Sequence, residues 1–206
     1  MSGLGNGIRR APHVREGDRA GLTVLELSIM MGLLLVVIVK ASLVTNSILD
    51  AQSKEGAAIE VEDRARQVLD RIAYQVMSCD YETLQPIIEE PGDAPGVTYL
   101  FALGLADGEV VWSDPMEIAL AVTDGDVYWR ENAGLPAERE VIWTSWAREY
   151  LQGEIPNGID DNGNGLIDEN GLAFSLDGTK VTIRLSLEGP DGGSPVLVER
   201  TVTCRN

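Results

Sequence analysis

A segment near the carboxyl end of the chain carries oxygen-bearing side chains at alternate positions. Residues 157–169 read NGIDDNGNGLIDE, so Asp160, Asn162 and Asn164 are two residues apart. Carboxylate and amide oxygens are the groups that hard divalent cations bind, and a chain that curls turns alternate side chains toward one centre. The spacing therefore predicts a calcium-binding loop over residues 157–171. A flexible turn rich in Asn, Asp and Gly, without metal, is the alternative.

The sequence also indicates how such a loop would be completed. It resembles the D-x-N-x-N-G half of calcium loops, with Gly165 at the sharp turn and Ile167 expected to pack the loop down. Gly171 occupies the twelfth position, where an EF-hand has a bidentate glutamate, so we expect a surface loop that binds calcium weakly. Either Asp168 or Glu169 would close the shell. The expected ligands are side-chain oxygens and one backbone carbonyl, from Asp160, Asn162, Asn164, Leu166, Asp168 and Glu169.

Residue types that serve common catalytic mechanisms are sparse. His13 is the only histidine, and it lies within the first 21 residues. The rest of the chain therefore offers no imidazole for general-base catalysis, for a Ser-His-Asp arrangement or for a zinc site of the usual kind. The sequence contains neither a glycine-rich phosphate loop nor a G-x-S-x-G motif. We expect that the protein is not an enzyme.

An apolar run over residues 22–39 contains one carboxylate, Glu26, near its start. As a helix this run would be about 27 Å long, close to the thickness of the hydrocarbon core of a bilayer. An unpaired carboxylate inside a bilayer costs about 2.5–3.5 kcal/mol, so Glu26 needs a partner. Cleavage after Gly21 would give Leu22 a terminal ammonium group. Glu26 of one copy can neutralise that group on a neighbouring copy when the helices form a bundle.

These residues resemble a known processing motif. Gly21, an apolar residue, Thr23, two aliphatic residues and Glu26 together are similar to the cleavage and methylation motif of type IV prepilins and type II secretion pseudopilins. The resemblance implies that a prepilin peptidase cuts after Gly21 and methylates Leu22, and that Glu26 pairs between subunits. Leu22 departs from the phenylalanine that the family most often has there. An ordinary signal peptide, cut near the Val-Lys-Ala sequence at residues 39–41, is the alternative.

Two further features are similar to J-type minor pseudopilins and to their W-type counterparts in pilus systems. The helical segment RQVLDRI covers residues 66–72, and the last predicted strand ends in Arg205 and Asn206. The resemblance implies a pilin-like α+β fold, in which a long amino-terminal helix packs against an antiparallel β-sheet, and a subunit of a tip or initiation complex. Whether the filament is a pilus or a secretion pseudopilus stays open. The alternative is a membrane-anchored extracytoplasmic domain that binds a ligand with calcium and does not polymerise.

The distribution of charge predicts topology and excludes one class of partner. Four arginines precede the apolar run, whereas only Lys40 follows it closely, so we expect a single pass through the inner membrane with the leader in the cytoplasm. Beyond residue 21 the chain has 12 basic and 31 acidic residues, a net charge of −19, which repels nucleic acid. The expected partners are other pilin or pseudopilin subunits, the prepilin peptidase and the inner membrane.

The chain has two cysteines, Cys79 and Cys204. Both would lie outside the cytoplasm, where disulfides form. A bridge that closes so long a loop constrains the unfolded chain by about 4–5 kcal/mol in the loop-entropy model. We predict this bridge. Two buried free thiols are the alternative, because a bridge needs the two Cα atoms to approach each other.

The pattern predicts four segments. Residues 1–21 form the leader, residues 22–40 the membrane or filament-core half of a helix, residues 41–80 its amphipathic half, and residues 81–206 an antiparallel β domain. In the amphipathic half, apolar residues recur at steps of three and four and form one stripe. They are Val61, Ala65, Val68, Leu69, Ile72 and Val76.

Three hairpins and a last strand are predicted after the helix. The first pairs residues 97–103 with 110–112. The second pairs residues 118–122 with 127–129 across an Asp-Gly turn at 124–125. The third pairs residues 172–176 with 180–187 across an Asp-Gly turn at 177–178. The last strand covers residues 195–203.

Overall fold

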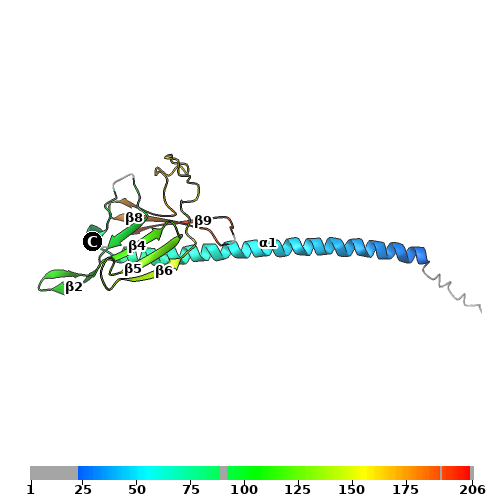
Figure 1. The fold of residues 1–206 in the computed structure, drawn as a ribbon, viewed down its shortest axis with the longest axis horizontal. Coiled ribbons are helices and arrows are strands. Elements are labelled where there is room, and N and C mark those ends of the chain that lie inside the picture. The colour runs from blue at the N-terminus through cyan, green and yellow to red at the C-terminus, as the bar shows by residue number, and fades with distance from the viewer. Residues whose placement is uncertain (1–22, 89–91, 191, 205–206) are drawn as a thin grey trace, which may run out of the picture. The chain divides into compact units, whose positions relative to one another are not determined.

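The computed structural model describes residues 23–88, 92–190 and 192–204. The chain divides into two compact units, residues 1–49 and 50–206. One helix, α1 (Val24–Ser78), is followed by antiparallel strands (Figure 1), which confirms the predicted α+β class. The helix begins and ends within two residues of its predicted bounds.

In the part of the chain that the structure describes, nine strands form three separate antiparallel sheets. A four-stranded sheet has the order β1 (Gly96–Tyr99), β4 (Met116–Ala121), β5 (Asp126–Glu131) and β6 (Arg139–Thr144). A three-stranded sheet contains β7 (Leu172–Asp177), β8 (Lys180–Leu187) and β9 (Val196–Thr203). A two-stranded hairpin consists of β2 (Ala102–Ala106) and β3 (Glu109–Trp112). A short 3-10 helix, η1 (Tyr81–Thr83), follows α1.

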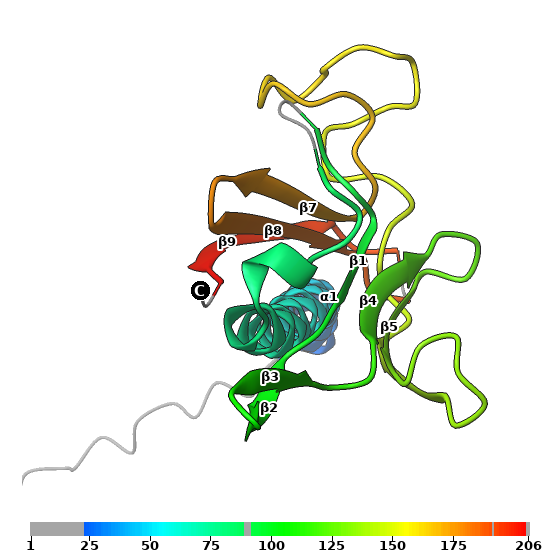
Figure 2. The same ribbon diagram turned by 90° about the vertical axis from the view of Figure 1, so that its left-hand side faces the viewer.

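The core of residues 50–206 lies between α1 and the two larger sheets. Every residue of the predicted apolar stripe is buried, and the stripe packs with strand residues such as Tyr99, Ile118 and Phe174 in one cluster. In Figure 2, which looks along this part of α1, the β7–β9 sheet and the strands β1, β4 and β5 lie on two sides of the helix. A backbone bridge between Ala94 and Phe174 connects the start of the first sheet to β7.

The strand predicted over residues 97–103 is two strands in different sheets. β1 ends at Tyr99 and pairs with β4, whereas β2 begins at Ala102 and pairs with β3. At the break, the N–H of Leu100 donates to Thr83 Oγ1 at 3.0 Å and the N–H of Phe101 donates to Ser113 Oγ at 3.1 Å. These side-chain oxygens replace ladder partners, so the prediction of one continuous strand and one sheet is wrong.

Two predicted turns differ in length or position. The β4–β5 connection contains residues 122–125, because Ala121 pairs with Asp126, and is therefore not a two-residue turn. The β7–β8 turn consists of residues 178–179, since Asp177 still pairs with Lys180. Gly178 has a φ of 57°, the left-handed conformation that such a turn needs at its first position. The prediction placed this turn one residue too early.

Candidate functional site

The first part of α1, residues 24–49, exposes apolar side chains on every side. All of these residues are exposed, and Glu26 and Lys40 are the only charged ones. The hydroxyl groups of Ser28 and Thr45 donate to backbone carbonyls one turn earlier, each at 2.9 Å, so these hydroxyl donors have hydrogen-bond partners within the helix. A helix that is apolar all round needs apolar surroundings. This helix is long and apolar enough to cross a membrane, as a span or as a signal sequence.

Glu26 has a local role that the sequence analysis missed. Its Oε2 atom accepts from the backbone N–H of Thr23 at 3.1 Å and from Thr23 Oγ1 at 3.2 Å. In return, the Glu26 N–H donates to Thr23 Oγ1 at 3.3 Å. This is a capping box, and the Thr-x-x-Glu signal was present in the sequence. Gly21 and Leu22 lie outside the described residues, so the pairing of Glu26 with a neighbouring Leu22 stays a prediction.

The predicted calcium loop is closed at its stem. Tyr150 and Asn170 form a backbone bridge, and the N–H of Leu151 donates to the carbonyl of Glu169 at 3.0 Å. These bonds hold the two ends of the segment 151–169 side by side, as in a compact surface loop. Glu154 therefore stands near one end of the loop and Glu169 at the other.

Within the loop, two predicted ligands bind backbone N–H groups. The carboxylate of Asp160 accepts from Gly163, Asn164 and Gly165 at 2.6–3.1 Å. The carboxylate of Asp168 accepts from the N–H groups of residues 157 and 158 at 3.1 and 2.8 Å. Both carboxylates thus stabilise the turns of the loop, which is what aspartate commonly does in such segments.

The side-chain amides of the two predicted asparagine ligands point at Glu169. Asn164 Nδ2 donates to Glu169 Oε1 at 2.8 Å, and Asn162 Nδ2 donates to Glu169 Oε2 at 3.4 Å. The backbone N–H of Asn162 also donates to Glu154 Oε1 at 3.1 Å. Asn162 therefore contacts both glutamates, of which Glu154 was not among the predicted ligands.

Burial has the largest effect on the pKa of the Glu169 carboxyl. Glu169 is fully buried and Arg184 Nη1 lies 3.8 Å from its Oε1 atom. Burial raises the pKa of the Glu169 carboxyl, the Asn164 hydrogen bond and Arg184 lower it, and the charges of Asp93 and Glu154 raise it again. The charges of Asp93 and Glu154 thus lie near enough to act on the Glu169 carboxyl.

One expectation about the loop is corrected, and one departure from the EF-hand pattern is explained. Ile167 is 57% exposed, and Leu166 is the residue that is buried, so Ile167 does not pack the loop down. Gly171 occupies the position of the EF-hand glutamate. A side chain does not fit there, because a Cβ atom would collide with the carbonyl group of Arg148. The N–H of Gly171 donates to the carbonyl of Glu149 at 2.9 Å. The close approach of two backbones explains why this position is glycine.

Across the described residues, no three His, Cys, Asp or Glu side chains gather as a ready metal site. A cation in the loop would therefore need amide or backbone oxygens in addition to carboxylates, as calcium accepts. Leu166 stays a candidate through its carbonyl group. Calcium binding remains a prediction at this point.

The two cysteines meet, as the predicted bridge requires. Cys79 and Cys204 are both buried free thiols, and Cys79 Sγ donates to Cys204 Sγ at 3.7 Å. This hydrogen bond and burial raise the pKa of the Cys79 thiol. The disulfide itself stays a prediction.

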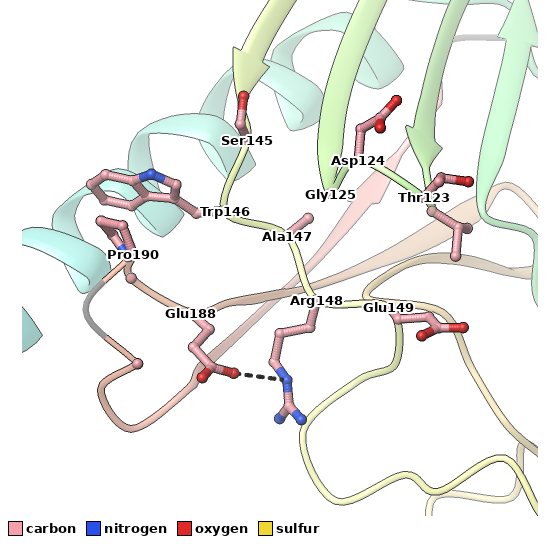
Figure 3. A pocket seen from close by; sticks show the side chains of 13 residues that line it. Thr123, Asp124, Gly125, Ser145, Trp146, Ala147, Arg148, Glu149, Glu188 and Pro190 are labelled. Atoms are coloured by element: carbon pink, nitrogen blue, oxygen red, sulfur yellow. Dashed lines mark ion pairs between the residues drawn. The ribbon is translucent and has the colours of Figure 1, made fainter.

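An open hollow of about 470 Å³ lies beside the β4–β5 loop (Figure 3). Arg148 and Glu188 form an ion pair at its edge, with Nε and Oε2 3.3 Å apart, and Trp146 lies next to Pro190. The described residues of the lining include serine and carboxylates but neither histidine nor cysteine. Trp146 also packs against the guanidinium of Arg64, 5.3 Å from its ring centre, so this tryptophan has a structural role.

Comparisons with profiles of known protein families, with curated proteins and with solved structures found no match for this chain.

Proposed function

We propose that this chain is a minor pilin or pseudopilin subunit. It assembles through the first part of α1 into a type IV pilus or a type II secretion pseudopilus, in a tip or initiation complex. A prepilin peptidase cuts after Gly21 and methylates Leu22. Before assembly the subunit crosses the inner membrane once, with residues 50–206 on the extracytoplasmic side.

The observation that carries this proposal is the exposed apolar part of α1 with one carboxylate in its first turn. The large apolar side chains of residues 24–49 are all exposed, so they need a membrane or other apolar helices around them. Glu26 lies at the end where processing would create a terminal ammonium group. In apolar surroundings the pair of Glu26 and a neighbouring Leu22 amine would fix both the order and the depth of the subunits.

The capping box determines which substitution of Glu26 is informative, because an apolar residue would remove the cap and the charge together. Glu26→Gln separates them: glutamine can still bind the N–H of Thr23, but it cannot neutralise an ammonium group. Thr23→Ala is the matched control, since it weakens the cap and leaves the charge. Each variant is expressed as full-length chain in cells that make the other prepilin-like subunits.

We expect Glu26→Gln to insert into the membrane normally and to enter filaments or tip complexes more than about tenfold less than wild type. A charge pair in apolar surroundings that loses one partner costs about 3–5 kcal/mol. Thr23→Ala should assemble nearly as wild type does. Wild-type incorporation of Glu26→Gln would contradict the pairing mechanism. A wild-type chain that co-isolates with no prepilin-like subunit would instead support the monomeric membrane-anchored domain.

A further inference from the structure

Residues 157–171 contain four Asn-Gly pairs. They are Asn157-Gly158, Asn162-Gly163, Asn164-Gly165 and Asn170-Gly171. Asparagine is thermally labile, because the backbone nitrogen of the next residue can attack its side-chain carbonyl carbon. Glycine has no Cβ, so it reaches the conformation for this attack more readily than other residues. In an unfolded chain this segment is therefore prone to deamidation.

The reaction is a cyclisation followed by hydrolysis. The glycine nitrogen loses its proton and forms a bond to the asparagine Cγ, the Cγ–Nδ2 bond breaks, and the proton leaves with Nδ2 as ammonia. Water then opens the succinimide at either carbonyl carbon, which gives aspartate or isoaspartate. Water is the only co-reactant. The first step depends on a free glycine N–H, because the nitrogen attacks only after it loses this proton.

In the folded loop, aspartate carboxylates bind the glycine nitrogens of the first three pairs. Asp160 accepts from the N–H of Gly163 at 2.6 Å and from that of Gly165 at 2.8 Å. Asp168 accepts from the N–H of Gly158 at 2.8 Å. Each hydrogen bond holds the proton on the nitrogen, and the negative carboxylate beside it disfavours the nitrogen anion that attacks.

The asparagine side chains are held as well. The Oδ1 atoms of Asn157, Asn162 and Asn164 each accept the N–H two residues further on, at 2.8–3.0 Å. The Nδ2 atom of Asn157 donates to Asp161, and those of the other two donate to Glu169. Deamidation of these residues therefore requires local opening of the loop, which frees both reacting groups at once.

The product would not fit the closed loop at Asn164. Asn164 Nδ2 donates to Glu169 Oε1 at 2.8 Å, and Glu169 is fully buried. Deamidation replaces this donor by a second carboxylate, which can only accept when it is ionised. Arg184 lies 3.8 Å from Glu169 but also binds Glu199, so it does not neutralise another buried carboxylate.

We infer that the loop carries a deamidation site that is protected while the loop is closed. Asp160 protects Asn162 and Asn164, and Asp168 protects Asn157. Deamidation of Asn164 keeps the loop from closing again, so the modification is a one-way conformational switch. This inference does not depend on the proposed assembly of the subunit.

The test measures deamidation at each asparagine in the full-length chain, purified in detergent micelles with chelator present. Folded wild type, wild type in urea, Asp160→Ala and Asp168→Ala are incubated in mildly alkaline buffer. Peptide mass spectrometry then quantifies aspartate and isoaspartate at each position. The two variants control each other, because each removes one carboxylate from the same loop but frees a different set of glycine N–H groups.

We expect Asn157, Asn162 and Asn164 to deamidate at least about tenfold more slowly in folded wild type than in urea, because the reaction requires loop opening. Asp160→Ala should accelerate the reaction at Asn162 and Asn164 at least about threefold more than at Asn157, as the loss of a hydrogen bond predicts. Asp168→Ala should give the reverse pattern.

The fourth pair is an internal reference. The N–H of Gly171 donates to the carbonyl of Glu149 in the stem of the loop, at 2.9 Å, and not to an aspartate. Deamidation of Asn170 should therefore be as slow in both alanine variants as in wild type. A rise at Asn170 would show that a variant has opened the whole stem, and Asp160→Asn or Asp168→Asn, which keeps one accepting oxygen, then replaces it.

Asn164→Asp tests the consequence, because it places the carboxylate of the product against Glu169 without any reaction. Hydrogen exchange of the loop N–H groups should be at least about tenfold faster than in wild type. Asn157→Asp is the matched control: it makes the same change of charge opposite Asp161, which is exposed, and should change the exchange rates by less than about threefold.

Three results would overturn the inference. Equal rates in folded and unfolded wild type would show that the closed loop gives no protection. Equal acceleration at the three loop asparagines in both aspartate variants, with Asn170 unchanged, would show that the individual carboxylates do not protect separate sites. Unchanged hydrogen exchange in Asn164→Asp would show that the modified loop still closes.

Discussion

Tyr99 illustrates how single residues hold the β domain on the helix. Its ring is fully buried, its hydroxyl donates to Gln75 Oε1 at 3.1 Å, and it accepts from Trp129 Nε1 at 3.2 Å. Burial raises the pKa of the Tyr99 hydroxyl, so the group stays neutral and keeps its proton for Gln75. One hydroxyl therefore joins α1, β1 and β5.

Tyr99→Phe should lower the free energy of unfolding by about 1–3 kcal/mol, because the partly buried Trp129 N–H and the Gln75 amide lose their partner. Urea unfolding followed by tryptophan fluorescence measures this change. Tyr128→Phe is the control, since Tyr128 lies under Arg130 with the guanidinium 4.2 Å from its ring centre, a contact that phenylalanine keeps. The control should change stability by no more than about 0.5 kcal/mol. Equal losses in both variants would show that the hydrogen bonds of Tyr99 contribute nothing.

Among the elements, α1 carries two kinds of surface on one continuous helix. Residues 24–49 are apolar all round, whereas the later part buries one stripe, from Val61 to Val76, and exposes charged pairs such as Glu62 and Arg66. The end of this second part is where Cys79 meets Cys204 after β9. The contact ties the last strand to the helix and links two distant parts of the sequence.

We predict that protein isolated from an oxidising compartment has a disulfide between Cys79 and Cys204. The two sulfur atoms are neighbours, and the bridge would constrain the unfolded chain by up to about 4–5 kcal/mol. Mass spectrometry after unfolding in a thiol-blocking reagent should show a chain lighter by two hydrogen atoms and without label. Cys204→Ser should take one label at Cys79 and unfold at lower temperature. Labelling of both cysteines in the wild-type chain would refute the bridge.

For the whole molecule, the proposed function depends on where the mature chain begins. Cleavage after Gly21 removes four basic and two acidic residues and leaves a chain with net charge −19. Mass spectrometry of the amino terminus should therefore find Leu22 first, with the added mass of a methyl group. A chain that begins at Ser42 would identify an ordinary signal peptide and contradict the pilin proposal. Gly21→Leu is the control and should stay uncleaved in the membrane.

The sequence by itself determined the features that depend on local pattern. The period of the apolar stripe and the turn-forming residues predicted α1, the β4–β5 and β7–β8 hairpins and the last strand, apart from details of the turns. They did so because helix and strand periods follow from backbone geometry alone. The same local chemistry marked the 157–171 segment as a loop rich in oxygen ligands.

Only the tertiary structure decided how distant residues meet. β1 pairs with β4 and not with the strand that was expected beside it. Thr83 and Ser113 accept hydrogen bonds from the backbone at the break between β1 and β2, and no local sequence pattern predicts these contacts. β6 was not predicted, since its first residues, Arg139 and Glu140, obscure the alternation of a strand.

The 151–169 loop shows the same division between local and distant information. The motif gave Glu169 and the asparagines, but Glu154 lies before it and joins them only because Leu151 pairs with Glu169 across the stem. Burial then separates the acids: Asp160 and Asp168 are partly or fully exposed and bind N–H groups of the loop, whereas Glu154 and Glu169 are buried. Burial depends on the packing of the whole domain, so a local pattern does not reveal it.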